Sequence, residues 1–129
     1  MKIQHFVNDQ YGVVVVTISG HVSGGEFAKV AARLFGDRTQ LLDYNCVIDL
    51  RDYDGDIGNS DLEGLRQMSA QQRTGPRPER HSIIVTSDPH FELWAAALDE
   101  QFSGRKHHVV RSLEAAFSLL EKVKVSTAA

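Results

Sequence analysis

The 129-residue chain has one cysteine and no long apolar run, and each of these scarcities excludes a class of structure. A single cysteine excludes an intrachain disulfide, and the strand-like run around Cys46 predicts a buried structural thiol. No apolar stretch approaches the length of about 18 residues that a transmembrane helix needs. Residues 1–5 also lack the apolar segment of a signal peptide. We therefore expect a cytoplasmic protein without stable membrane insertion.

Positive charge is also scarce, because the chain has 14 Lys and Arg but 17 Asp and Glu, which gives a net charge of −3. Nucleic-acid-binding domains carry a basic patch or stripe instead. Three arginines do cluster within residues 73–80, but the two prolines among them indicate a solvated loop. We therefore expect no nucleic-acid partner. The length and the 42% hydrophobic content predict a single globular domain over residues 1–129.

Apolar runs and turn residues alternate along the chain and predict its secondary structure. Strands over 3–7 and 13–18, joined by the turn-rich residues 8–12, form an antiparallel hairpin. The second strand is nearly all apolar, which predicts a central position with both faces covered. Three more strands are predicted over 46–50, 81–86 and 107–110. The tail from Ser126 onward is expected to fray.

Helix patterns follow four capping residues, namely Ser23, Ser60, Asp88 and Ser112. Glu26 and Glu63 complete capping boxes with the first two serines. The alternation of strands with helices predicts an α/β fold with right-handed crossovers. The expected architecture is an N-terminal β-hairpin followed by βα units, in a mixed, mostly parallel five-stranded sheet with about four helices.

The chemically richest stretch follows the strand at 46–50, and a second polar segment follows the strand at 81–86. In open α/β sheets, ligands and partners meet the carboxyl ends of the strands. Five residues at these ends are the predicted binding surface: Asp49, Asp52, Ser60, Thr86 and Ser87.

The acidic loop also invites a metal interpretation. Asp52, Asp54, Asp56 and Glu63 have the ligand spacing of an EF-hand, but Ile57 stands where that loop requires glycine. The adjacent His107 and His108 point to opposite faces of a strand and cannot share one ion. We therefore predict no metal site and no cofactor, and interpret the acids as a solvated loop.

Catalytic motifs are incomplete. Asp49 ends a strand like the phosphorylated aspartate of a response-regulator receiver, but the acidic pair and the lysine of that pattern are missing from their places. No Gly-x-Ser-x-Gly motif is present. The sequence predicts no catalytic residue, although a site assembled in space stays open.

Three segments together carry a family resemblance: residues 13–26, Val47 to Asp52, and Ile83 to Pro89. The most informative is a strand that ends in Asp-Leu-Arg-Asp and is followed by a loop and a capped helix. The chain resembles the SpoIIAA-like (STAS-like) family of small bacterial proteins. The resemblance implies a fold close to the anti-sigma-factor antagonists and the CRAL-TRIO domains, and a non-enzymatic signalling role.

Antagonists of this family also carry Asp-Ser-x-Gly-Leu, whose serine a partner kinase phosphorylates. The matching place here reads Asn59-Ser60-Asp61-Leu62, so the first Asp and the Gly are absent. A phosphate on Ser60 would lie at a helix N-terminus, which favours negative charge. Because the capping box is complete without a phosphate, Ser60 is interpreted first as an N-cap and second as a weak phospho-site.

Two functional hypotheses follow. The first is a regulatory protein-interaction module that docks a partner at the loop after Asp49 and the helix from Asp61, with an exposed surface around Tyr53, Ile57 and Leu62. A homo-oligomer through an exposed sheet edge is compatible with it. The second is a carrier of a small apolar ligand or lipid, with a pocket between the sheet and the 89–103 helix. The stripe of Phe91, Trp94, Ala95, Leu98 and Phe102 fits either a cavity wall or a packed core.

Overall fold

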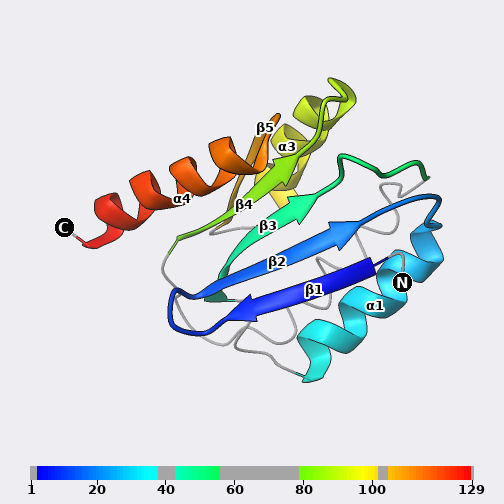
Figure 1. Ribbon diagram of the computed structural model, residues 1–129, viewed down its shortest axis with the longest axis horizontal. Coiled ribbons are helices and arrows are strands. Elements are labelled where there is room, and N and C mark those ends of the chain that lie inside the picture. Colours follow the sequence, from blue (N-terminus) through cyan, green and yellow to red (C-terminus); the bar gives the residue numbers. More distant parts are fainter. Residues whose placement is uncertain (1–2, 38–42, 56–78, 102–104, 129) are drawn as a thin grey trace.

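The computed structural model describes residues 3–37, 43–55, 79–101 and 105–128 (Figure 1). Five strands form one sheet in the order β1 (Ile3–Asn8), β2 (Val13–Ile18), β3 (Asn45–Asp49), β4 (Arg80–Val85) and β5 (Arg105–Val110). β1 is antiparallel to β2, and every other neighbouring pair is parallel. The described helices are α1 (Gly24–Asp37), α3 (His90–Gln101) and α4 (Leu113–Ala128).

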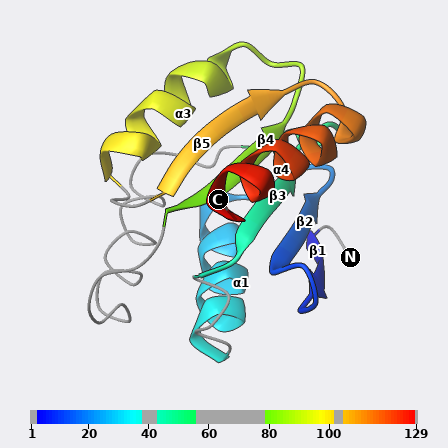
Figure 2. The same cartoon turned by 90° about the vertical axis from the view of Figure 1, so that its left-hand side faces the viewer.

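The helices cover the two faces of the sheet unequally. Figure 2 shows α1 and α3 on one side and α4 on the other. On the first side, Phe27 of α1 and Phe91 of α3 pack against a buried cluster that includes Ile18 and Ile84. On the second side, Ala116 and Leu120 of α4 pack into a cluster with residues of β3 and β4. The core is therefore split into two layers by the sheet.

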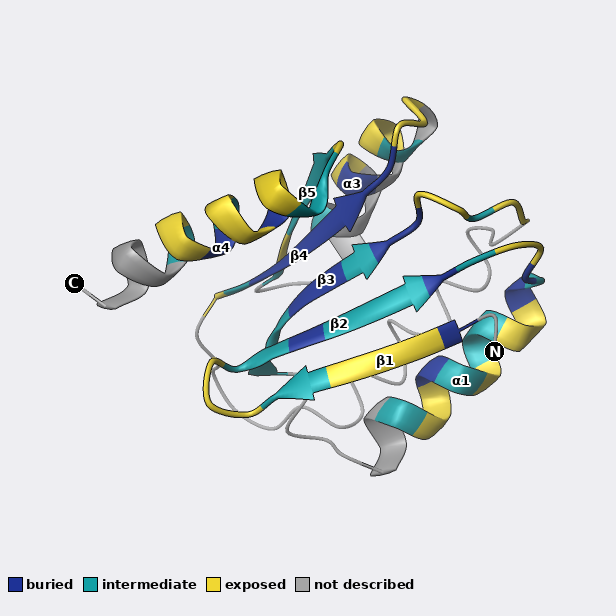
Figure 3. Ribbon diagram, in the orientation of Figure 1, coloured by how far each residue is buried: buried dark blue, intermediate teal, exposed yellow. Residues whose placement is uncertain are grey.

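Burial along the strands follows from this arrangement (Figure 3). β4 is covered on both faces, and five of its six residues are buried. β2 lies inside the sheet as predicted, but β3 and not β2 is the middle strand. Most of β2 is only half-buried because α4 lies over β3, β4 and β5 and leaves Val13 and Val15 partly uncovered.

The predicted α/β architecture is confirmed: a hairpin comes first, and parallel strands connected by helices follow. β5 begins at Arg105, two residues before the predicted start, because Arg105 and Lys106 already pair with Arg80 and His81 of β4. The guanidinium of Arg105 also bonds to Ser82 and to Tyr44. α4 continues to Ala128, where fraying was expected, since no glycine or proline interrupts it. The sequence predicts about four helices, and three of them are described. The helix predicted from Asp61 lies outside the described residues.

The predicted cap at the start of α1 is present in altered form. The amide of Glu26 donates to Ser23 Oγ at 3.2 Å, as in a capping box. The Glu26 carboxylate, however, accepts from the Ser23 hydroxyl at 3.4 Å rather than from a backbone amide. Ser112 caps α4 in the same way, because its Oγ accepts from the amide of Ala115 at 3.1 Å.

Replacing Ser23 by alanine should lower the free energy of unfolding by about 1 kcal/mol, because the amide of Glu26 loses its acceptor at the helix start. Urea unfolding followed by circular dichroism measures this. Ser23→Asp keeps an acceptor oxygen and is the matched control, which should retain most of the stability. Equal losses in both variants would show that the hydroxyl does not act as a cap.

Candidate functional site

The end of β3 is built around an ion pair between Asp49 and Arg51. The side chain of Asp49 is buried, with 6% of the residue exposed. Arg51 Nε donates to Asp49 Oδ1 at 2.9 Å and Arg51 Nη2 donates to Asp49 Oδ2 at 2.9 Å. The Arg51 amide adds a third bond to Oδ1 at 3.1 Å. Both carboxylate oxygens are thus occupied by one planar, bidentate partner.

These bonds fix the charge state of Asp49. The hydrogen bond from the Arg51 side chain lowers the pKa of Asp49 below its ordinary value, although burial acts in the opposite direction. The carboxylate is therefore ionised at neutral pH, with its oxygens directed to Arg51. In this position Asp49 anchors the loop that follows it, because both of its oxygens bind Arg51.

The loop after β3 is also held by its backbone on both sides. The amide of Leu50 donates to Val85 O at 2.9 Å, at the end of β4. On the other side, Gly20 N donates to Asp52 O at 2.8 Å and Asp54 N donates to Gly20 O at 2.9 Å. Gly20 has a φ of 71°, a conformation that favours glycine. The loop is consequently fastened to the ends of β2 and β4.

The turn after β4 reaches the same edge. Thr86 is buried, and its amide donates to Val110 O at 2.9 Å. Its Oγ1 accepts from the amide of Asp88 at 3.1 Å and shapes the turn into α3. Ser87 is exposed beside it. Thr86 is therefore placed to support the turn, whereas Ser87 is open to contact from outside.

Four of the five predicted site residues lie at this carboxyl edge, because β3 and β4 are parallel neighbours with Asp49 paired to Val85. Asp49 and Thr86 are buried, so they position the loops, and Asp52 and Ser87 are exposed. Ser60 lies outside the described residues, as do Ile57 and Leu62. The role of these residues in binding stays a prediction.

Sequence reasoning missed Arg51. The signal was present in Asp-Leu-Arg-Asp, where an arginine follows a strand-end acid by two residues. We call the exposed side chains of the two loops the carboxyl-edge surface: Arg51, Asp52, Asp54, Ser87 and Asp88. Three acids and one arginine give this surface a net negative charge.

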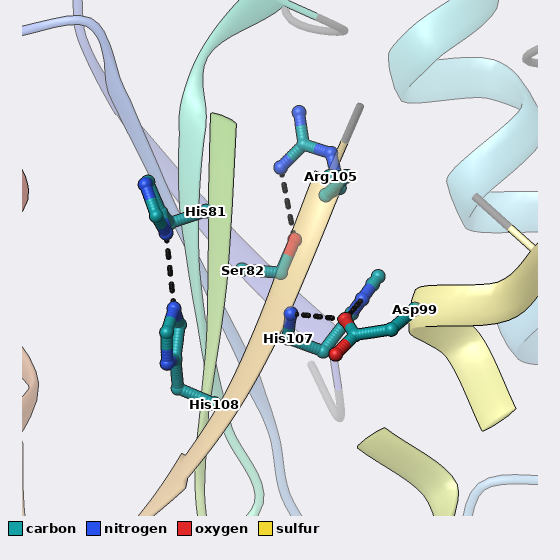
Figure 4. A network of polar contacts seen from close by, with 6 residues as sticks. All are labelled: His81, Ser82, Asp99, Arg105, His107 and His108. Atoms are coloured by element: carbon teal, nitrogen blue, oxygen red, sulfur yellow. Dashed lines mark hydrogen bonds and ion pairs between the residues drawn. The ribbon is translucent and has the colours of Figure 1, made fainter. Parts of the chain in front are cut away.

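A second polar cluster lies where β4, β5 and α3 meet (Figure 4). His81 Nδ1 and His108 Nε2 share a hydrogen bond of 3.0 Å, and their rings are stacked with centroids 5.2 Å apart. On the opposite face, Asp99 of α3 accepts from the His107 amide at 2.6 Å and from His107 Nδ1 at 2.9 Å. The prediction that His107 and His108 point to opposite faces is confirmed.

Burial controls the protonation of this cluster. It lowers the pKa of His81, and the nearby His108 acts in the same direction. Burial also lowers the pKa of His107, which outweighs the opposing effect of Asp99. Both imidazoles are thus favoured in the neutral form. Within the described residues, no three His, Cys, Asp or Glu side chains are placed to hold a metal ion.

The thiol of Cys46 is buried in β3, as predicted. Burial raises its pKa to about 11, against a smaller opposite effect of Arg105. Arg105 itself donates to Ser82 Oγ at 2.9 Å and to Tyr44 O at 2.8 Å. These groups join β5 to β4 and to the start of β3, which indicates a structural role.

A groove of about 860 Å³ opens on the α4 face, between the β1–β2 hairpin and α4. Its apolar lining includes Phe6, Val13, Val15, Phe117 and Leu120. Phe6 and Phe117 are both exposed. The groove exists because α4 leaves the hairpin half of this face uncovered.

The carrier hypothesis predicts its pocket on the opposite face of the sheet, beneath α3. Phe91 packs against the core and Ala95 is buried, so these members of the apolar stripe face inward. The side chains of Trp94, Leu98 and Phe102 lie outside the described part of the chain. A cavity beside them stays a prediction.

No protein-family model matches the sequence, and no curated protein matches it significantly. Solved structures do match in shape. An uncharacterized protein of the DUF3478 family from Shewanella loihica PV-4, with a SpoIIAA-like fold, aligns with a TM-score of 0.63 at 10% identity over 92% of this chain and 91% of its own. An anti-sigma factor antagonist from Mycobacterium paratuberculosis aligns with a TM-score of 0.50 at 18% identity over 92% and 94%.

These similarities show that the chain has a SpoIIAA-like fold, in agreement with the resemblance stated from the sequence. At such low identity they concern the fold alone. None of the helices in the described ranges is long and apolar enough to cross a membrane.

Replacing Asp49 by asparagine should lower the free energy of unfolding at pH 7 by about 1–2 kcal/mol, because a buried, charge-assisted acceptor is lost. Asp52→Asn is the matched control, since Asp52 is exposed, and should change stability by less than about 0.5 kcal/mol. The pKa of Asp49 is lower in the folded chain, so its contribution is present above the unfolded pKa of about 3.9 and is lost as pH falls through the folded value. Urea unfolding at several pH values measures both effects, and similar losses in the two variants would contradict the anchoring role.

Acidification from pH 7 to pH 5 should destabilise the protein. His81 has a lowered pKa in the folded chain, so below the unfolded value of about 6.5 the unfolded chain binds more protons and unfolding is favoured. His107 contributes in the same direction. Thermal unfolding across this range should show a shallower pH dependence in His81→Gln than in the wild type. An unchanged slope would contradict the assignment.

Proposed function

We propose that the protein is a non-enzymatic regulatory module of the STAS-like type, which binds a protein partner at its carboxyl-edge surface. The observation that carries this proposal is the bidentate pair between Asp49 and Arg51. A strand-end aspartate that reacts with a phosphate needs an accessible oxygen, whereas the Asp49 side chain is only 9% exposed and both of its oxygens bind Arg51. Asp49 holds the loop in place, and a fixed loop favours docking because little ordering entropy is lost on binding.

The charge of the surface indicates the chemistry of the partner. Asp52 and Asp54 are exposed on the loop of Arg51 and Asp88 is exposed on the turn after β4, so a partner with basic side chains fits best. Complementary charge mainly accelerates association and selects among partners. The fold supports the same class of function, since a solved protein of similar fold is by name an anti-sigma factor antagonist.

Ser60 would regulate this surface. It follows the Asp52 loop in sequence, and a phosphate there would add negative charge at the start of the helix predicted from Asp61. Phosphorylation would then strengthen the electrostatic attraction between this surface and a basic partner. The sequence departs from the antagonist motif at two places, because Asn59 replaces its Asp and Leu62 stands in place of its Gly.

A carrier function is the second candidate, and the groove favours it. Its volume of about 860 Å³ and its lining by Phe6, Val15 and Phe117 suit a small apolar ligand. This site lies between the hairpin and α4, in contrast to the position beneath α3 that the sequence predicted.

Site-specific photocrosslinking in the native host tests the interaction module. A photoreactive amino acid at position 52 should form a covalent adduct with another protein. The same amino acid at position 122, an exposed site on α4, is the matched control and should not form that adduct. Equal crosslinking at both positions, or an adduct at position 122 alone, would contradict docking at the carboxyl edge.

Native mass spectrometry of the protein purified from its host separates the two candidates. The interaction module predicts the mass of one protein chain, or of its dimer, without a small-molecule adduct. An additional mass of lipid size, released on denaturation, would favour the carrier instead. An added phosphate mapped to Ser60 would support the regulatory switch, and a phosphate elsewhere would remove Ser60 from the account.

A further inference from the structure

Within the described ranges, the outer edge of the sheet at β1 has no partner strand. β1 pairs with β2 on one side, and no described residue bonds to the backbone on its other side. Natural proteins block such edges with lysine, proline, bulges or very short strands. The six residues Ile3–Asn8 contain no lysine, proline or acid, and their register with β2 is regular throughout. Nothing in β1 opposes the addition of another strand.

The middle of this strand also exposes a large apolar side chain. Phe6 is 64% exposed, and its neighbours Gln4 and His5 are exposed as well. Phe6 is opposite Val15 of β2 and lies on the groove side of the sheet. A strand added at this edge would bury Phe6 and satisfy the free backbone groups together.

We propose that β1 pairs antiparallel with β1 of a second copy of this chain, so that two sheets join into one. A twofold axis perpendicular to the sheet preserves the two faces, so opposite residues must share a face. The register that places Phe6 opposite Phe6 meets this condition. It also places Gln4 opposite Asn8 and His5 opposite Val7. Directly opposite side chains lie within contact distance, at about 4.5–5.5 Å between their Cβ atoms.

The residues in this register are self-complementary. Two phenylalanine rings meet at the centre, and on the same face each Gln4 amide meets an Asn8 amide. Because β1 carries no acid, lysine or arginine, the pairing opposes no like charges. A basic or acidic peptide strand would gain no ionic contact here, which favours a second copy as the occupant.

The opposite edge of the sheet explains why the assembly would stop at two copies. β5 carries an exposed lysine, Lys106, and α3 packs against this strand. Both features are typical of blocked edges. Pairing through β1 alone is isologous and closes at a dimer. The proposal does not depend on the carboxyl-edge surface, which lies on other loops.

Sedimentation and light scattering at tens of micromolar protein test the dimer. The wild type should have a mass of twice 14.3 kDa. Phe6→Lys, which introduces repulsion across the twofold axis, should halve this mass while keeping the circular dichroism spectrum. Leu93→Lys is the matched control, because Leu93 of α3 is 75% exposed but remote in sequence from β1, and it should remain dimeric. A monomeric wild type, or a dimer lost in Leu93→Lys and kept in Phe6→Lys, would overturn the proposal.

Cysteine crosslinking tests the register and does not depend on the lysine variant folding. Phe6→Cys should form an interchain disulfide under mild oxidation, since the two cysteines would lie opposite each other. The native Cys46 is buried and should not compete. Gln4→Cys alone should stay uncrosslinked, but a mixture of Gln4→Cys and Asn8→Cys should crosslink. Crosslinking of Gln4→Cys alone, with none in Phe6→Cys, would overturn the register.

Discussion

A buried carboxylate is stable only when it accepts hydrogen bonds, and Asp49 accepts three of them from Arg51. This pair determines how the chain leaves the middle strand of the sheet. Once Arg51 is fixed, Leu50 bonds to the end of β4, and Asp52 and Asp54 bond to Gly20 beyond β2. The exposed side chains of the carboxyl-edge surface are therefore held by the sheet itself. The functional proposal depends on this arrangement, in which Asp49 holds the loop in place and does not take part in a reaction.

The second constraint is the unequal covering of the sheet. α4 lies over β3, β4 and β5, and the hairpin half of its face stays open. The groove and the exposed Phe6 both result from this uncovered half of the face. In a dimer through β1, the antiparallel arrangement would direct the two carboxyl edges away from each other. Each copy could then hold a partner at an opposite end of the joined sheet.

The sequence predicts much of the fold but only part of the site. Alternating apolar runs and capping serines locate the hairpin, the strands and the start of α1, because these signals are local. The meeting of Asp52 and Ser87 at one edge also follows, since ends of parallel strands lie together. The bidentate geometry of Arg51 depends on the turn after Leu50, and the contact of His81 with His108 depends on strand register. The groove depends on which strands α4 covers. These features are tertiary contacts, and the spacing of residues along the sequence does not specify them.

The most direct test of the central claim is a carbon-detected NMR titration of the Asp49 carboxyl carbon, recorded together with the Nε–H signal of Arg51. The account predicts that Asp49 titrates below the ordinary aspartate value of about 3.9 and that the Arg51 Nε–H is protected from exchange until Asp49 is protonated. Titration at or above that value, with an Arg51 Nε–H that exchanges as freely as in an unstructured peptide, would contradict the anchoring pair and the docking surface built on it.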